Sequence, residues 1–279
     1  MDARGGLGEA IDLAASLTGC EKNETPWRRV RYNSEMPGEL ATLVETAPTV
    51  VEAEIPVGSA RLRWFEVCLV LLITCGSNFL SSLYIFVNGP SGASHFPGAR
   101  WTIGIVQESA GLLLLGYVLF RSNRRFKDIG LSWSLRQVGS GLLVAIISYI
   151  SYSIGYTLIH FLHAALFPHA AAGPTPRDLF GHASLMMVPF SLLNPFFEEL
   201  IVRAYLMTEV SALTGSSVLA IILSVLVQTS YHLYYGWIGA LTLSFQFLVF
   251  AIYFARTRKA LPIIVAHGIF DLLALLWLR

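Results

Sequence analysis

The sequence predicts an all-α, polytopic membrane protein: a membrane helical bundle with about seven transmembrane helices. Of its 279 residues, 54% are hydrophobic and 13% are charged. Soluble domains carry about 25% charged residues, so this chain has roughly half the usual load. The mean hydropathy is +0.61, and long uncharged runs fill the chain from Trp64 to its end.

Seven of these runs approach the length needed to cross a bilayer, whose hydrocarbon core of about 30 Å requires about 20 apolar helical residues. They are Trp64–Val87, Trp101–Phe120, Val138–Leu162, Ser184–Met207, Ser217–Tyr234, Ile238–Ala255 and Leu261–Leu278. The fourth run contains Pro189 and Pro195. We therefore expect that span to be kinked or broken just ahead of its charged residues.

Lysines and arginines in the short loops predict the orientation. Seven spans place three basic clusters on the side of the N-terminus, before the first span, after the second and after the sixth. The loops on the opposite side contain only Arg100 and Arg177. Positively charged loops remain in the cytoplasm, so the N-terminus is expected there, in what we interpret as a bacterial inner membrane. The segment FKDIGLSWSLRQ after the second span is either an interfacial segment or a plain loop.

We divide the chain into a flexible cytoplasmic tail over residues 1–60, N-terminal transmembrane helices over 61–183 and a C-terminal membrane core over 184–279. The tail has no apolar run long enough for a signal peptide. Cys20, Cys68 and Cys75 have neither a metal-ligand spacing nor an even number. The net charge of +1 does not indicate a nucleic-acid partner. The apolar spans make the lipid bilayer an expected partner.

Charged residues within the C-terminal spans indicate where chemistry is carried, because a charge inside the bilayer is costly unless paired. The fourth span reads NPFFEELIVRAYL and contains Glu198, Glu199 and Arg203. Glu199 and Arg203 are four residues apart with the acid first, the better orientation for an ion pair. Glu198 points about 100° away around the helix, so it is left available as a general base. The alternative is that these side chains only bridge helices.

Two histidines follow on later spans. His232 lies near the end of the fifth, one turn after Gln228, and is either functional or an interfacial residue bonded to a neighbour. His267 and Asp271 lie four residues apart on one face of the last span. They could coordinate a metal together, the aspartate could orient the histidine, or they could form a purely structural pair. Glu108, deep in the second span, has no role in this scheme.

The EExxxR pattern on one span, a histidine ending a later one and HxxxD on another resemble the CPBP family, the CAAX-protease and bacteriocin-processing membrane proteins that include type II CAAX prenyl endopeptidases. The resemblance covers roughly Ser184–Leu278. Two positions depart from the family pattern. The histidine motif usually begins with phenylalanine where this chain has Gln228, and the last motif often ends in asparagine where it has Asp271.

This resemblance implies an intramembrane endopeptidase whose conical cavity opens toward the cytosol. Its expected partner is a peptide or membrane-protein substrate, in which it cleaves a membrane-associated or C-terminal peptide. In a glutamate-dependent mechanism, Glu198 polarises the attacking water, and His232 with Asp271 stabilises the oxyanion. Glu199 and Arg203 would hold the geometry. His267 would assist.

In a metalloprotease mechanism, a divalent metal, most naturally Zn²⁺, is held by the same site. Its expected ligands are Glu198, His232, His267 and Asp271. The chain has no HExxH motif, so no independent signal indicates a metal.

Two other functions remain open at this point. A catalytically silent scaffold or immunity-type protein could use the same fold to bind a partner. A proton-coupled transporter also uses buried acids and histidines, but it is expected to contain repeats with paired broken helices. This chain has one proline-broken span and no convincing second copy, so the peptidase is the leading interpretation.

Overall fold

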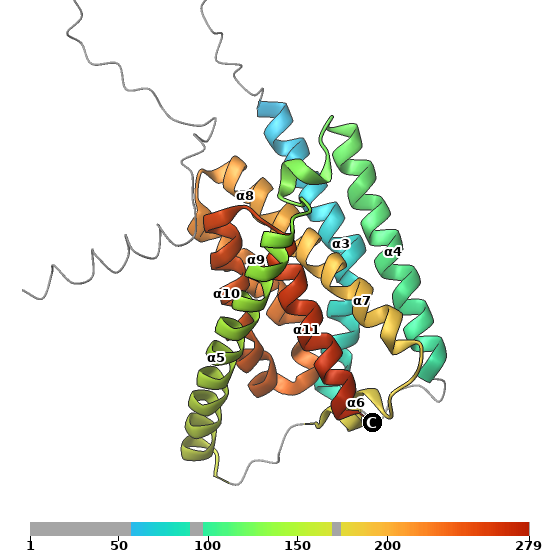
Figure 1. Cartoon of the computed structure of the whole chain (residues 1–279), viewed down its shortest axis with the longest axis vertical. Coiled ribbons are helices and arrows are strands. Elements are labelled where there is room, and N and C mark those ends of the chain that lie inside the picture. The colour runs from blue at the N-terminus through green and yellow to red at the C-terminus, as the bar shows by residue number, and fades with distance from the viewer. Residues whose placement is uncertain (1–56, 90–96, 169–173, 279) are drawn as a thin grey trace, which may run out of the picture. The chain divides into compact units, whose positions relative to one another are not determined.

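The computed structural model describes residues 57–89, 97–168 and 174–278, which form helices and no strands (Figure 1). The expected tail over residues 1–60 lies almost entirely outside this described part. In chain order the helices are α3 (Val57–Asn88), α4 (Pro97–Arg121), the 3-10 helix η2 (Phe126–Ile129), α5 (Leu135–Leu166), α6 (Pro176–Phe180), α7 (Met187–Glu198), the π-helix η3 (Glu199–Tyr205), α8 (Leu206–Thr214), α9 (Ser217–Tyr231), the 3-10 helix η4 (Leu233–Tyr235), α10 (Gly236–Thr257) and α11 (Leu261–Trp277).

Four of the described helical segments are long and apolar enough to cross a membrane. They are Ala60–Asn88, Ala99–Arg121, Leu135–Leu166 and Leu233–Thr257. The apolar helices Ser217–Tyr231 and Leu261–Leu276 are shorter. Large apolar side chains point away from the protein, including Leu113, which is 74% exposed, and Phe120, which is 82% exposed. Helices with such faces need an apolar solvent, so the chain is an integral membrane protein.

Helix α11 lies at the centre of the bundle, between α5 on one side and α7 on the other (Figure 1). Helix α5 approaches its neighbours closely at two glycines. A Cβ atom on Gly141 would lie 2.7 Å from the side chain of Val265 in α11, and one on Gly155 would lie 2.5 Å from Phe245 in α10. The short interhelical distances follow from these missing side chains.

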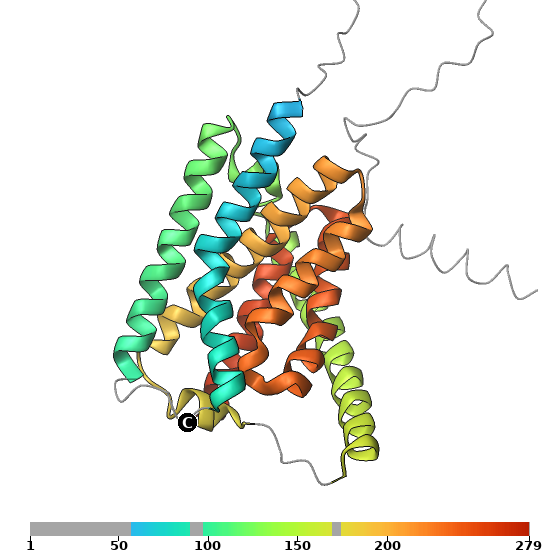
Figure 2. The ribbon, with the colours of Figure 1, turned by 180° about the vertical axis from the view of Figure 1, so that it is seen from behind.

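On the opposite side of the bundle, α3 runs beside the orange helices in the view from behind (Figure 2). It contacts α9 and η4. The Ser82 hydroxyl of α3 accepts a 2.7 Å hydrogen bond from the backbone N–H of Tyr234. Helix α3 therefore braces the turn that follows His232.

The predicted fourth span is one continuous helical run whose form changes at its charged residues. Pro195 lies inside α7 and has no N–H to continue the α-helical hydrogen-bonding pattern. From Glu199 to Tyr205 the helix is a π-helix, and all seven residues are buried. The Ser224 hydroxyl of α9 donates to the Val202 carbonyl of this segment at 2.9 Å. The expected interruption is thus a π-helix at the charged residues, a form often found at functional sites.

The three basic clusters meet at one end of the bundle. Glu209, only 3% exposed, accepts hydrogen bonds from Arg63 before the first span and Arg124 after the second. The backbone N–H of Ala260, after the sixth span, donates to the Gly130 carbonyl at 2.9 Å.

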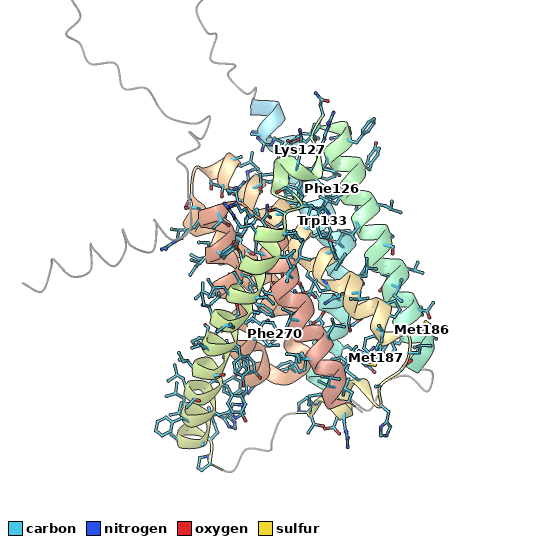
Figure 3. The ribbon with its side chains drawn as sticks, viewed as in Figure 1. Phe126, Lys127, Trp133, Met186, Met187 and Phe270 are labelled. Carbon is cyan, nitrogen blue, oxygen red and sulfur yellow. The ribbon has the colours of Figure 1, made fainter. Side chains whose placement is uncertain are left out.

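The segment expected either at the interface or in a plain loop lies at this same end. Ile129 at the end of η2 is buried, whereas Trp133, four residues later, is 76% exposed. Figure 3 shows Lys127 and Trp133 near this end, and Met186 and Met187 near the opposite one.

Candidate active site

The two consecutive glutamates lie where α7 becomes the π-helix. Glu198 is the last residue of α7 and Glu199 the first of η3. Both side chains are buried, Glu198 at 6% exposure and Glu199 at 0%. Buried carboxylates require hydrogen bonds or opposite charges, and each glutamate has a different set of partners.

Glu199 pairs with the arginine of its own helix. The Arg203 Nε atom lies 3.5 Å from Glu199 Oε2, and both side chains are fully buried. The guanidinium also lies over the Phe247 ring, 5.5 Å from its centroid, and its Nη2 atom donates to the Phe247 carbonyl at 3.4 Å. Helix α10 therefore fixes the arginine from one side, while Glu199 compensates its charge.

Glu199 also holds the histidine of α11. His267 Nδ1 lies 2.8 Å from Glu199 Oε1. A carboxylate only accepts hydrogen bonds, so Nδ1–H is the donor. The opposite ring atom, Nε2, lies 3.9 Å from Glu198 Oε2 and 3.6 Å from Asp271 Oδ1. The Glu199 contact thus orients the ring so that Nε2 faces the other two acids, an arrangement seen where carboxylates orient functional histidines.

Gln228 of α9 contacts both Glu198 and His232. Its side-chain Nε2 donates to Glu198 Oε2 at 2.6 Å, and its carbonyl lies 2.8 Å from His232 Nδ1. Because a carbonyl cannot donate, His232 carries a hydrogen on Nδ1, and the neutral ring has its lone pair on Nε2. His232 follows α9 directly and is 9% exposed.

Asp271 is tied to α7 as well as to His267. Asn194 Nδ2 donates to Asp271 Oδ2 at 3.1 Å. An amide group has two hydrogens, so this contact uses one of them. Asp271 is the most accessible acid of the group, with its side chain 24% exposed.

The group has the donor atoms of a divalent metal site. Ligand atoms of Glu198, Glu199 and His267 lie within 4.8 Å of one another. When His267 donates from Nδ1 to Glu199, three hydrogen-bond acceptors face one another, namely His267 Nε2, Glu198 and Asp271. A second ring proton or a cation is then needed between them. One imidazole with carboxylate oxygens suits Zn²⁺ or a similar ion. The grouping within 4.8 Å differs from the ligand set expected from sequence, because it includes Glu199 and neither His232 nor Asp271.

All these side chains belong to one segment that is similar to a known family. Residues 180–273 match the family model described as type II CAAX prenyl endopeptidase Rce1-like. Residues 180–273 form an Rce1-like domain. The match confirms the family resemblance inferred from the motifs, and it covers about a third of the chain. Type II CAAX endopeptidases are proteases, so the match to this protease family implies peptide substrates. Neither a curated protein nor a solved structure matches the chain significantly.

Two polar residues of the Rce1-like domain were not assigned a site role from sequence. Gln228 stood out only as a departure from the family pattern, yet its side chain contacts Glu198 directly. Asn194 belongs to the same NPFFEE stretch as the two glutamates, and it contacts Asp271. The spacing of four residues between Asn194 and Glu198 was the available signal, because it places both on one face of α7.

Proposed function

We propose that this protein is an intramembrane endopeptidase that hydrolyses a peptide bond of a membrane-associated or C-terminal peptide. The observation that carries the proposal is the position of Glu198, buried inside the Rce1-like domain between Gln228 and His267. Its neighbour Glu199 is compensated by Arg203. Glu199 is therefore structural, and Glu198 remains to accept a proton.

In the proposed reaction, Glu198 removes a proton from water as the water oxygen attacks the scissile carbonyl. The C–N bond then breaks, and Glu198 returns the proton to the leaving amine. The lone pair at His232 Nε2 accepts the second water hydrogen and orients the nucleophile. This role fits the Nδ1 contact with the Gln228 carbonyl better than donation to the oxyanion, since donation would require a second proton on the His232 ring.

The developing oxyanion needs a donor, and α7 offers one. The second side-chain hydrogen of Asn194 is available while the first bonds Asp271. A single such donor typically contributes a factor of roughly 10²–10³ in rate. We assign Asp271 to holding Asn194, and Glu199 with Arg203 to holding His267.

The donor set described above fits a divalent metal. Glu198, Glu199 and His267 would hold it, with Asp271 beside them. A bound Zn²⁺ would supply Lewis-acid activation of the attacking water. Under this arrangement Glu199 would act as a ligand and would still be paired with Arg203.

We infer seven spans with a conical cavity that opens toward the cytosol. The four long segments are joined by the α7–η3–α8 run and by α9 and α11, which are 15 and 17 residues long. Helices of this length span about 23–26 Å, so they cross a bilayer only where it is locally thin or where the protein surrounds them. The basic end of the bundle is then cytoplasmic, in a bacterial inner membrane, with the catalytic core in residues 184–279.

The test is cleavage of a quenched-fluorescence peptide library by the purified protein in detergent, comparing wild type with Glu198→Gln. Loss of the general base should lower the rate by roughly 10²–10⁴-fold. Glu209→Gln is the matched control, because Glu209 is an equally buried carboxylate that lies at the basic end, bonded to Arg63. It should lower the melting temperature and retain cleavage.

Chelator treatment and metal analysis of the same samples separate the two forms of water activation. A rate that is restored by Zn²⁺ after chelation supports the metal form, and an insensitive rate supports Glu198 alone. No cleavage of any peptide by a folded wild-type protein would refute the endopeptidase and favour a scaffold or immunity-type role.

A further inference from the structure

Glu108 of α4 is a buried carboxyl outside the Rce1-like domain. Its side chain is 4% exposed, and its Oε2 atom has no hydrogen-bond partner among the described residues. It belongs to α4, which precedes the matched segment by many residues. An unsatisfied buried carboxyl oxygen costs on the order of 1–3 kcal/mol, so its presence in this membrane-spanning helix calls for a compensating interaction.

The packing of α4 on α7 places Glu108 at the level of the active site. A Cβ atom on Gly104 would lie 2.8 Å from the Phe190 ring, and one on Gly111 would lie 2.6 Å from Phe197. In both contacts the residue number in α7 exceeds the residue number in α4 by 86. Because this offset is constant, the two helices run parallel. The same offset pairs Glu108 with Asn194. The glycines on either side allow the close approach.

Electrostatic coupling supports this placement. Glu108 lies within electrostatic range of Glu198, Asp271 and His267. The acid therefore faces the same volume as the proposed general base. Glu108 is not among the three residues whose ligand atoms lie within 4.8 Å, so it stands apart from the potential metal ligands.

This volume contains more acidic than basic side chains. Four acids meet there, namely Glu108, Glu198, Glu199 and Asp271. The described cations are Arg203, which is paired with Glu199, and His267, whose ring is shared among the other acids. An acidic surplus in a low-dielectric site favours a ligand that brings a positive charge.

We propose that Glu108 binds a cationic side chain of the substrate, so that the enzyme prefers peptides with lysine or arginine next to the scissile bond. This inference rests on the proposed endopeptidase function. Oε2 would accept a charge-assisted hydrogen bond from the substrate ammonium or guanidinium group. Asn194, which the register places at the same level as Glu108, contacts Asp271, so the subsite lies next to the hydrolytic group.

The test compares two peptides that differ only in having lysine or norleucine at the preferred position next to the scissile bond. Norleucine keeps the aliphatic chain and removes the charge. Wild type should cleave the lysine peptide at least roughly tenfold faster in kcat/KM, the factor expected for one charge-assisted hydrogen bond. In Glu108→Gln the preference should shrink to within about twofold, because the variant keeps the shape and loses the charge.

Gln107→Ala is the matched control, because Gln107 is the exposed neighbour of Glu108 on the same helix. It should keep the lysine preference. A purely structural role for Glu108 predicts equal losses for both peptides, and that result would overturn the proposal. So would a loss of bound metal in Glu108→Gln. Wild-type cleavage without any preference for basic residues refutes the subsite alone, whereas absence of all cleavage refutes the endopeptidase.

Discussion

Arg203→Met should destabilise the protein strongly, because it leaves Glu199 buried without its cation. Both side chains are fully buried, and the Arg203 Nε atom lies 3.5 Å from Glu199 Oε2. Methionine retains an unbranched apolar chain of similar length, so the main loss is the charge and its hydrogen bonds. At an effective dielectric constant of 20, two unit charges at this distance attract by about 5 kcal/mol.

Measured losses for removing one partner of a buried pair are of similar size, about 3–5 kcal/mol. For a protein of this length, such a loss corresponds to a fall in melting temperature on the order of 10 °C. Tryptophan fluorescence during heating in detergent would report it. A double-mutant cycle combines this variant with Glu199→Gln, whose amide oxygen can still accept a hydrogen bond from His267.

The double variant decides whether the pair itself is responsible. With both charges gone, no buried charge is left uncompensated, so Arg203→Met with Glu199→Gln should be more stable than Arg203→Met alone. The coupling energy from the four melting curves should exceed about 2 kcal/mol. Destabilisations that simply add would refute the reasoning, because they would mean that Arg203 stabilises the fold through packing on Phe247 and not through Glu199.

Three further substitutions test the site and its supports. Gln228→Leu removes the donor to Glu198 at 2.6 Å and should lower kcat/KM by roughly tenfold or more in the peptide assay; an unchanged rate would exclude a role in positioning the base. Gly111→Ala forces a Cβ to within 2.6 Å of Phe197 and should cost about 1–3 kcal/mol in thermal unfolding, with recovery when Phe197→Leu is added. Gly130→Ala places a side chain at φ 99° against the backbone of the loop after α10 and should cost on the order of 1–3 kcal/mol, a value that an unchanged melting curve would contradict.

Sequence patterns predicted the features of this site that depend on local spacing. The separation of four residues between Glu199 and Arg203 predicted an ion pair, and the two charged groups do form one. The same spacing placed His267 and Asp271 on one face of α11, and their side chains lie 3.6 Å apart. Such contacts arise within one helix, so the helical period determines them before any tertiary packing.

Contacts between helices could not be read from the same patterns. The approach of Gln228 to Glu198 joins residues 30 positions apart and depends on how α9 packs on α7. The π-helix from Glu199 to Tyr205 was expected only as an interruption near Pro195. Glu108 had no interpretation at all until the glycine contacts with α7 defined the register of α4. Each of these features depends on the relative rotation of two helices, which periodicity alone leaves open.

Asp271→Asn separates the two roles that an acid at this position can have. In the proposed mechanism Asp271 serves as the acceptor that holds Asn194 at 3.1 Å, and an asparagine carbonyl can accept that bond equally well. The variant should therefore keep kcat/KM within about tenfold of wild type, whereas Asp271→Leu, which removes the acceptor, should lose roughly 10²–10³-fold as the oxyanion donor becomes disordered. Asp271 Oδ1 lies 3.6 Å from His267 Nε2, so its charge could instead balance a cation bound between them. In that case Asp271→Asn should lose as much activity as Asp271→Leu, and metal analysis of the two purified variants should show the same loss of bound ion.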